Sequence, residues 1–147
     1  MFSKATEYAL RATIYIAQHT TEERKCRIDE IARGIDAPVS FTAKILQALR
    51  KDDQVIQSVS GPNGGFYMSP KCRKKPVRAI LDAMNEGEVL EKCVLGLKKC
   101  SNTSPCPMHH DYKEIKKKLL RLFEDKTIQD LADDTNNGGM FLKLGKK

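Results

Sequence analysis

The sequence SFTAKILQALRKDDQVIQSVSGPNGGF at residues 40–66 joins a helical pattern to a hairpin pattern. Ser40 belongs to a residue type that favours helix N-caps, and apolar residues follow it at helical spacing. These apolar residues are Ile45, Leu46 and Leu49. Residues 55–60 then alternate as a β-strand does, and residues 66–68 can pair with them across a glycine-rich turn. We therefore predict one helix followed by a β hairpin.

Two more helices are predicted upstream. Residues 4–19 carry apolar side chains at helical spacing, with Ser3 as the predicted N-cap. A shorter helix follows and stops near Gly34, and Pro38 prevents it from continuing. The order helix, short helix, helix, hairpin is that of a winged helix-turn-helix, which we assign to residues 1–75. Its third helix would enter the major groove of DNA.

The downstream half is predicted to be helical with one irregular segment. Residues 76–110 form a connecting helix, which begins at Pro76, and then a cysteine-rich loop. A long helix is predicted from residue 112 through residue 132, within the region 111–134, and residues 135–147 form a flexible tail. The apolar seam of the long helix consists of Tyr112, Ile115, Leu119 and Leu122. This seam needs a partner, either its own domain or a second chain.

Composition narrows the class of protein. The 147 residues are 40% hydrophobic and 31% charged, which excludes a disordered chain. No apolar run approaches the roughly 18 residues of a membrane span, and no secretory signal is visible, so we expect a cytoplasmic protein. Lysine and arginine number 26 against 19 acidic residues, with the larger excess in the first 75 residues. This charge favours a polyanionic partner.

Three cysteines crowd into one segment. Cys93, Cys100 and Cys106 follow the pattern C-x6-C-x5-C, and His109 comes three residues later. Clustered thiolates in a loop suit an iron-sulfur cluster or zinc, although structural zinc sites more often use cysteines two to four residues apart. The fourth ligand would be His109 or an acidic side chain from elsewhere. A zinc-stabilised module and free thiols remain the alternatives, and the distant Cys26 and Cys72 are not expected to be ligands.

Taken together, these segments resemble the bacterial winged-helix iron-sulfur transcriptional regulators, the family of IscR and NsrR. The resemblance covers nearly the whole chain. It is carried by TEYALR at residues 6–11, Ile31-Ala32, SFTAKILQ at 40–47, SVSGPNGGF at 58–66 and the cysteine loop. It implies a fold that is mainly α with a small β hairpin, in which a winged helix-turn-helix domain is followed by a long C-terminal dimerisation helix.

The resemblance also implies a cofactor and partners. It implies a homodimer on a palindromic double-stranded DNA operator and a cluster held by Cys93, Cys100 and Cys106. In relatives a histidine at the position of His109 accompanies a 2Fe-2S cluster, whereas an acidic residue at the position of Glu7, from the other subunit, accompanies a 4Fe-4S cluster. The expected function is a transcriptional regulator or repressor that senses redox state, nitric oxide or iron-sulfur status. The alternative is a zinc-stabilised or cluster-free, thiol-based DNA-binding or interaction protein.

Operator contacts are expected from the third helix and from the hairpin. The predicted contacts are Ser40, Phe41, Thr42, Lys44 and Gln47 in the helix, with Ser60 and Asn63 in the hairpin. Ser60 stands where relatives usually carry an arginine suited to a narrow minor groove. No arrangement of side chains suggests a catalytic site, so we do not expect an enzyme.

Overall fold

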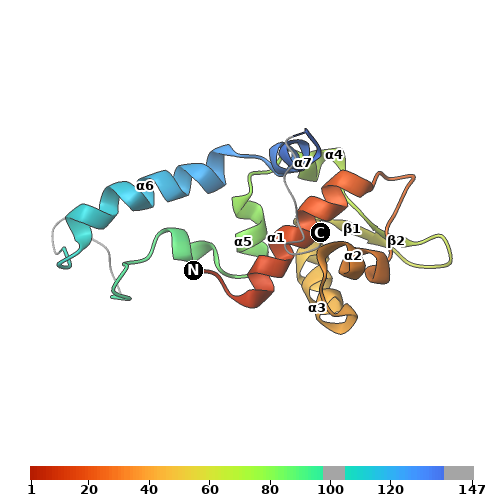
Figure 1. Ribbon diagram of the computed structural model, residues 1–147, viewed down its shortest axis with the longest axis horizontal. Coiled ribbons are helices and arrows are strands. Elements are labelled where there is room, and N and C mark those ends of the chain that lie inside the picture. The colour runs from red at the N-terminus through yellow and green to blue at the C-terminus, as the bar shows by residue number, and fades with distance from the viewer. Residues whose placement is uncertain (98–104, 138–147) are drawn as a thin grey trace.

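The computed structural model describes residues 1–97 and 105–137. Its elements are α1 (Lys4–His19), α2 (Ile28–Ile35), α3 (Val39–Arg50), the 3-10 helix η1 (Lys51–Asp53), β1 (Gln57–Val59), β2 (Gly65–Tyr67), α4 (Pro70–Arg73), α5 (Arg78–Ala83), the 3-10 helix η2 (Gly87–Leu90), α6 (His109–Asp125) and α7 (Ile128–Asn137). Figure 1 shows α1, α2, α3 and the hairpin gathered at one end, with η2 and α6 projecting from the other. The predicted class, mainly α with a small antiparallel hairpin, is confirmed.

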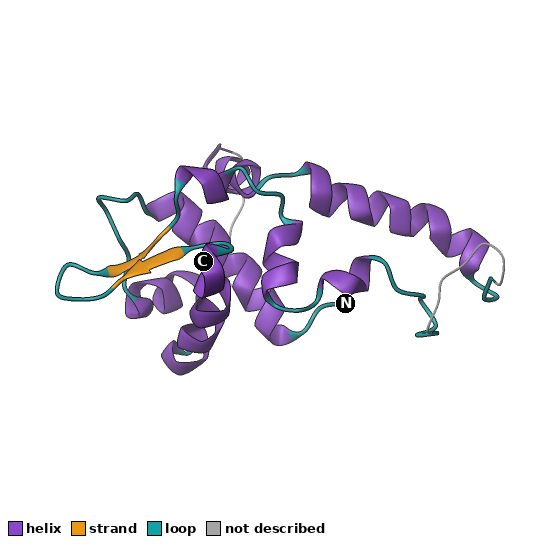
Figure 2. Ribbon diagram, turned by 180° about the vertical axis from the view of Figure 1, so that it is seen from behind, coloured by secondary structure: helices purple, strands orange, loops and turns teal. Residues whose placement is uncertain are grey.

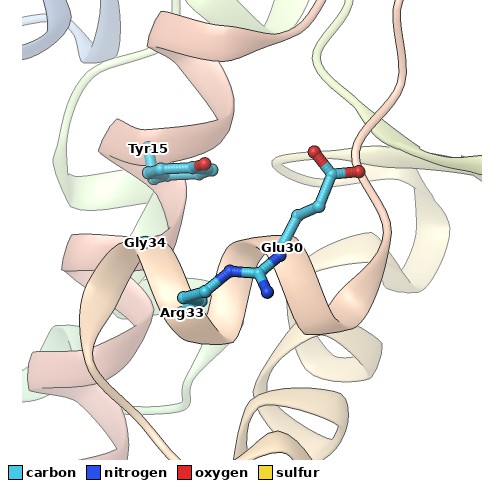
Figure 3. A pocket seen from close by; sticks show the side chains of 4 residues that line it. All are labelled: Tyr15, Glu30, Arg33 and Gly34. Atoms are coloured by element: carbon cyan, nitrogen blue, oxygen red, sulfur yellow. The ribbon is translucent and has the colours of Figure 1, made fainter.

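The first two helices follow the sequence prediction closely. α1 has the predicted bounds, and its Ser3 cap accepts a hydrogen bond from the Thr6 N–H at 3.2 Å. α2 continues one residue past the predicted stop at Gly34 and ends where Asp36 adopts a left-handed conformation with φ 57°. Gly34 is needed for a different reason, because a Cβ there would overlap the ring of Tyr15 on α1 (Figure 3).

The third helix begins before the predicted cap. Pro38 occupies the N-cap position of α3, so Ser40 lies inside the first turn and its prediction as the cap was wrong. The hydroxyl of Thr42 donates to the Pro38 carbonyl at 2.8 Å, which helps to fix this start. The three apolar residues predicted to face inward, Ile45, Leu46 and Leu49, are at most 2% exposed.

The hairpin is shorter than predicted and gains an additional partner. Only Gln57–Val59 of the predicted strand is paired, in antiparallel register with β2, because Val55 and Ile56 enter the core instead. An isolated bridge between Cys26 and Phe66 brings the segment before α2 alongside β2. Gly64 closes the turn tightly, since a Cβ there would overlap the backbone carbonyl of Val59.

The single long helix predicted for residues 112–132 is two helices. The chain is extended at Lys126, between α6 and α7, because the backbone there pairs with an earlier segment. The Val77 N–H donates to the Lys126 carbonyl at 2.9 Å, and the Ile128 N–H donates to the Lys75 carbonyl at 3.0 Å. The same pairing explains why α5 begins at Arg78 and not at the predicted Pro76.

After this break, α7 packs on α1 and completes the core of the winged-helix domain. Ile128 and Ala132 on α7 are 0% and 1% exposed. α7 extends to Asn137, so residues 135–137 are helical where a flexible tail is predicted. The rest of that predicted tail lies outside the described residues.

We call η2, α6 and the segments beside them the arm, residues 87–97 and 105–125. The arm and the hairpin lie at opposite ends of the molecule (Figures 1 and 2). On α6 the seam residues Ile115 and Leu122 are 59% and 54% exposed. The described chain therefore leaves much of the predicted seam uncovered.

Glu86, at the base of the arm, holds the N-terminus of α1. Its carboxylate accepts hydrogen bonds from the Ser3 hydroxyl at 2.6 Å, from the Ser3 N–H at 3.1 Å and from the Thr6 hydroxyl. These donors, the Ser3 hydroxyl first, lower the pKa of Glu86 below its ordinary value of 4.5. The carboxylate form therefore stabilises the fold above that value, and the stabilisation is lost as the pH falls through the depressed pKa.

We expect Glu86→Gln to lower the free energy of unfolding at pH 7 by about 1 kcal/mol, allowing for solvent screening of this partly exposed group. The difference from wild type should shrink as the pH falls below 4.5, where the wild-type carboxylate becomes protonated. Urea unfolding at several pH values measures both effects. Glu88→Gln, at an exposed position in η2, is the control. An equal loss of unfolding free energy at every pH would contradict the assignment of a charged Glu86 carboxylate.

Candidate DNA-binding surface and cysteine site

The outer face of α3 carries three of the predicted operator contacts. Ser40, Lys44 and Gln47 are all exposed, and their spacing of four and three residues places them on one helical face. Gln47 on this face lines one hollow with Ser60 of the hairpin. The helix and the hairpin lie together at the end of the molecule away from the arm (Figures 1 and 2). The arrangement presents a hydroxyl, an ammonium and an amide to one partner surface.

Two other predicted contacts on α3 point inward. Thr42 is fully buried, and its hydroxyl is used by the Pro38 carbonyl. This burial removes Thr42 from the residues available to DNA, because packing against α1 turns its helical face toward the core. Phe41 is half-buried, and its ring packs edge-on against Tyr8 with centroids 5.3 Å apart. Its ring is thus engaged within the domain.

A hollow of about 250 Å³ lies between α3 and the hairpin. Its lining includes Gln47 and Arg50 of α3 and Ser60 of the hairpin. Ser60 and Asn63 are exposed, as a contacting loop requires. Arg50 was not among the predicted contacts, although its position three residues after Gln47 indicates the same helical face. The hollow thus joins helix and hairpin into one polar surface.

The arm brings two of the predicted cysteine ligands together. Cys93 follows η2 and Cys106 precedes α6, and their sulfur atoms are 3.5 Å apart. Cys93 is only 2% exposed. Backbone N–H groups of Leu95 and, more weakly, Leu97 lower the pKa of the Cys93 thiol, which favours the thiolate. Cys100 lies outside the described residues.

His109 is the first residue of α6, so it belongs to a helix and not to the predicted loop. Its backbone N–H donates to the Cys106 carbonyl at 3.0 Å, and its side chain is 6% exposed. Burial lowers the pKa of His109, which favours the neutral imidazole that metals bind. Within residues 1–97 and 105–137, no three cysteine, histidine or acidic side chains form a group able to hold a metal ion.

The remaining predicted ligand and the other cysteines lie in the winged-helix domain. Glu7 is exposed in the first turn of α1. Cys26 and Cys72 are buried in the hydrophobic core of that domain. Cys72 is fixed further by a hydrogen bond from the Gln57 amide at 3.2 Å. Core packing therefore accounts for these two thiols.

Comparison with known proteins identifies the family. The model of the Rrf2 family, described as iron-dependent transcriptional regulators, matches residues 2–134. The chain belongs to the Rrf2 family. An Aquifex aeolicus protein named as an HTH-type transcriptional regulator is 34% identical over 90% of this chain and 92% of its own. IscR of Serratia proteamaculans is 22% identical over 86% of this chain and 76% of its own.

Solved structures confirm the Rrf2 fold. T. potens IscR superimposes with a TM-score of 0.70 at 19% identity, covering 95% of this chain and 91% of its own. CymR, the global cysteine regulator of B. subtilis, superimposes with a TM-score of 0.67 at 18% identity, covering 90% of this chain and 96% of its own. The match of the family model over residues 2–134 confirms the predicted family, whose members are DNA-binding transcriptional regulators. None of the helices in the described parts of the chain has the length and apolarity needed to cross a membrane.

Proposed function

We propose that this Rrf2 protein is a homodimeric transcriptional regulator whose affinity for a palindromic operator is set by an iron-sulfur cluster on the arm. The observation that carries this proposal is the approach of the Cys93 and Cys106 sulfurs to 3.5 Å. The protein would act in the cytoplasm, on DNA, without catalysing a reaction. Its signal would be redox state, nitric oxide or iron-sulfur status.

The donor atoms fit a metal-thiolate site. Two thiolates on one tetrahedral metal ion with bonds of about 2.3 Å lie about 3.8 Å apart. The distance of 3.5 Å between the Cys93 and Cys106 sulfurs is close to this value. Backbone N–H groups directed at a cysteine sulfur stabilise its thiolate, the form that metals bind. The pair is therefore preorganised as two ligands.

We assign the ligand set to Cys93, Cys100, Cys106 and His109, with Glu7 of the partner subunit as the alternative to His109. His109 is favoured because it is buried and neutral, and because it follows Cys106 by three residues across a turn closed by the His109 N–H and the Cys106 carbonyl. When bound, an iron-sulfur cluster would supply a group whose state responds to oxidants and small reactive molecules. A histidine set corresponds to 2Fe-2S, and the partner's Glu7 corresponds to 4Fe-4S, as in the relatives that the sequence resembles.

The chain offers a route from the cysteine segment to the DNA-binding surface. Arg78 on α5 binds Glu91 at 3.2 Å, two residues before Cys93, and binds Glu124 on α6 at 2.9 Å. Movement of the arm would therefore act on α5 directly. From α5, Glu86 reaches the N-terminus of α1, against which α3 packs. These contacts would let a change at the cysteines reposition the recognition helix.

The test is a visible absorption spectrum with iron and sulfide analysis on protein purified without air. We expect a coloured wild type containing sulfide, and complete loss of colour in Cys100→Ala and Cys106→Ala. Cys26→Ala removes a core thiol and should keep the colour. His109→Ala should lose or alter the spectrum, whereas retained colour there with loss in Glu7→Ala would assign the other ligand set. A colourless wild type, with zinc or with no metal after reconstitution, would contradict the cluster.

The thiol pair also favours a second candidate, a cluster-free thiol switch on the same DNA-binding fold. Sulfurs 3.5 Å apart can form a Cys93–Cys106 disulfide after a small movement. Its closure would release two electrons and two protons to an oxidant such as hydrogen peroxide, giving water. A protein that lacks metal, but in which peroxide removes two titratable thiols, would support this candidate.

A further inference from the structure

The hairpin that is placed to approach DNA contains no positive charge of its own. No lysine or arginine occurs between Lys51 and Lys71. A protein loop that lies against the phosphate backbone gains most of its affinity from cations that displace condensed counterions. The hairpin must therefore take such a cation from another part of the chain, or it contributes little to binding.

The segment before α2 supplies cations to the hairpin. Cys26 and Phe66 exchange backbone hydrogen bonds of 2.9 and 2.7 Å, so this segment runs beside β2 as a third strand would. On one side of Cys26, the guanidinium of Arg27 donates to the Pro62 carbonyl in the hairpin turn at 2.5 Å. On the other side, the Lys25 ammonium lies over the Tyr67 ring, 5.4 Å from its centroid.

Position 27 is an unfavourable place for an arginine on local grounds. It is the N-cap of α2, where serine, threonine, aspartate or asparagine would cap the free N–H groups, and the Arg27 side chain has no acceptor oxygen. A cation also lies at the positive end of the helix dipole there. A side chain that is unfavourable for local helix stability, as Arg27 is at this N-cap, is expected where the residue serves binding.

We propose that Arg27 is the phosphate-binding residue of the hairpin, held at the turn by Pro62 and directed at the DNA backbone. The guanidinium has five N–H donors, and the Pro62 carbonyl occupies one end of it. The side chain is exposed, so the remaining donors can bind a phosphate oxygen pair. The inference rests on the DNA-binding part of the proposed function and is independent of any cluster.

The test measures the salt dependence of DNA binding. The probe is a fluorescein-labelled 30-base-pair duplex of mixed sequence, titrated by anisotropy at several salt concentrations. Arg27→Gln should make the negative slope of log K against log salt less steep by about 1 for each Arg27 that binds a phosphate, about 2 for the proposed dimer, and should weaken binding by at least about 3- to 10-fold. Arg27→Lys should keep the slope. Lys117→Gln removes one exposed charge from the arm and should leave the slope unchanged.

A second variant keeps the proposal falsifiable if the hairpin loosens. Asn63 is exposed beside Pro62, so Asn63→Arg in the Arg27→Gln background returns a cation to the turn and should restore the slope. If Arg27→Gln keeps the wild-type slope while Lys44→Gln lowers it, the inference on Arg27 is wrong and DNA binding stands. The inference is also wrong if neither Arg27→Lys nor the Asn63→Arg double variant keeps the slope. If wild type does not bind the duplex, the proposed function itself fails.

Discussion

Leu122→Lys is expected to convert the proposed homodimer to a monomer and to lower its affinity for the proposed palindromic operator by about 10²- to 10³-fold. Leu122 and Ile115 are one heptad apart on α6, and both are more than half exposed in the single chain. A lysine buried between two apolar seams would leave two uncompensated charges at the interface. A monomer then binds each half-site separately and loses the gain in effective concentration that joins the two.

Sedimentation velocity measures the oligomeric state, and anisotropy with a duplex selected by the wild type measures operator affinity. The matched control is Lys118→Gln, at an exposed position on the same helix. Because Leu122 is exposed, the variant monomer should keep the wild-type far-UV circular dichroism spectrum. A wild type that sediments as a monomer while binding its operator would overturn the assigned seam.

Ile128→Ala is expected to produce the largest loss of stability, about 2–5 kcal/mol in the free energy of unfolding. Ile128 is fully buried at the start of α7, where this helix packs on α1. Removing three methyl or methylene carbons there leaves a cavity that the surrounding helices can close only in part. The loss would show that α7 belongs to the winged-helix core and not to the projecting helix before it.

Urea unfolding at equal protein concentration, followed by circular dichroism, gives the free energies of unfolding of the wild type and of Ile128→Ala. Val39→Ala is the control, because Val39 is 52% exposed at the start of α3 and should change stability by no more than about 0.5 kcal/mol. If Ile128→Ala cost no more than Val39→Ala, the packing of α7 on α1 would not contribute to the fold.

Local sequence signals located the first three helices and the hairpin, although they misplaced the start of α3 and overestimated the length of the hairpin. The spacing of apolar residues in α1 and the Ser3 cap depend on neighbours within a few positions, so the sequence specifies them directly. The break at Lys126 does not depend on its neighbours. It arises because residues 126–128 pair with residues 75–77, some fifty positions earlier, and no periodicity within the helix records that pairing.

The candidate site likewise has features that depend on nearby residues and features that depend on residues far apart in the sequence. Cysteine density in one segment pointed to Cys93 and Cys106, whose sulfurs lie 3.5 Å apart, and loop closure over so few residues costs little entropy; their role as ligands stays a prediction. Thr42 precedes Ile45, Leu46 and Leu49 by three, four and seven residues, so helical spacing already places it on the inward face of α3, where the structure finds it fully buried. The contact of Arg27 with Pro62 joins residues 35 positions apart, so it could be found only in the folded chain.

The packing of α7 on α1 also fixes the order in which a newly made chain can mature. As residues emerge from the ribosome, α1 is among the first to appear, and the helix that covers it is among the last. Every residue of the cysteine segment lies between them in the chain. A nascent polypeptide therefore cannot complete the core of this domain before the segment with Cys93 and Cys106 has been synthesised.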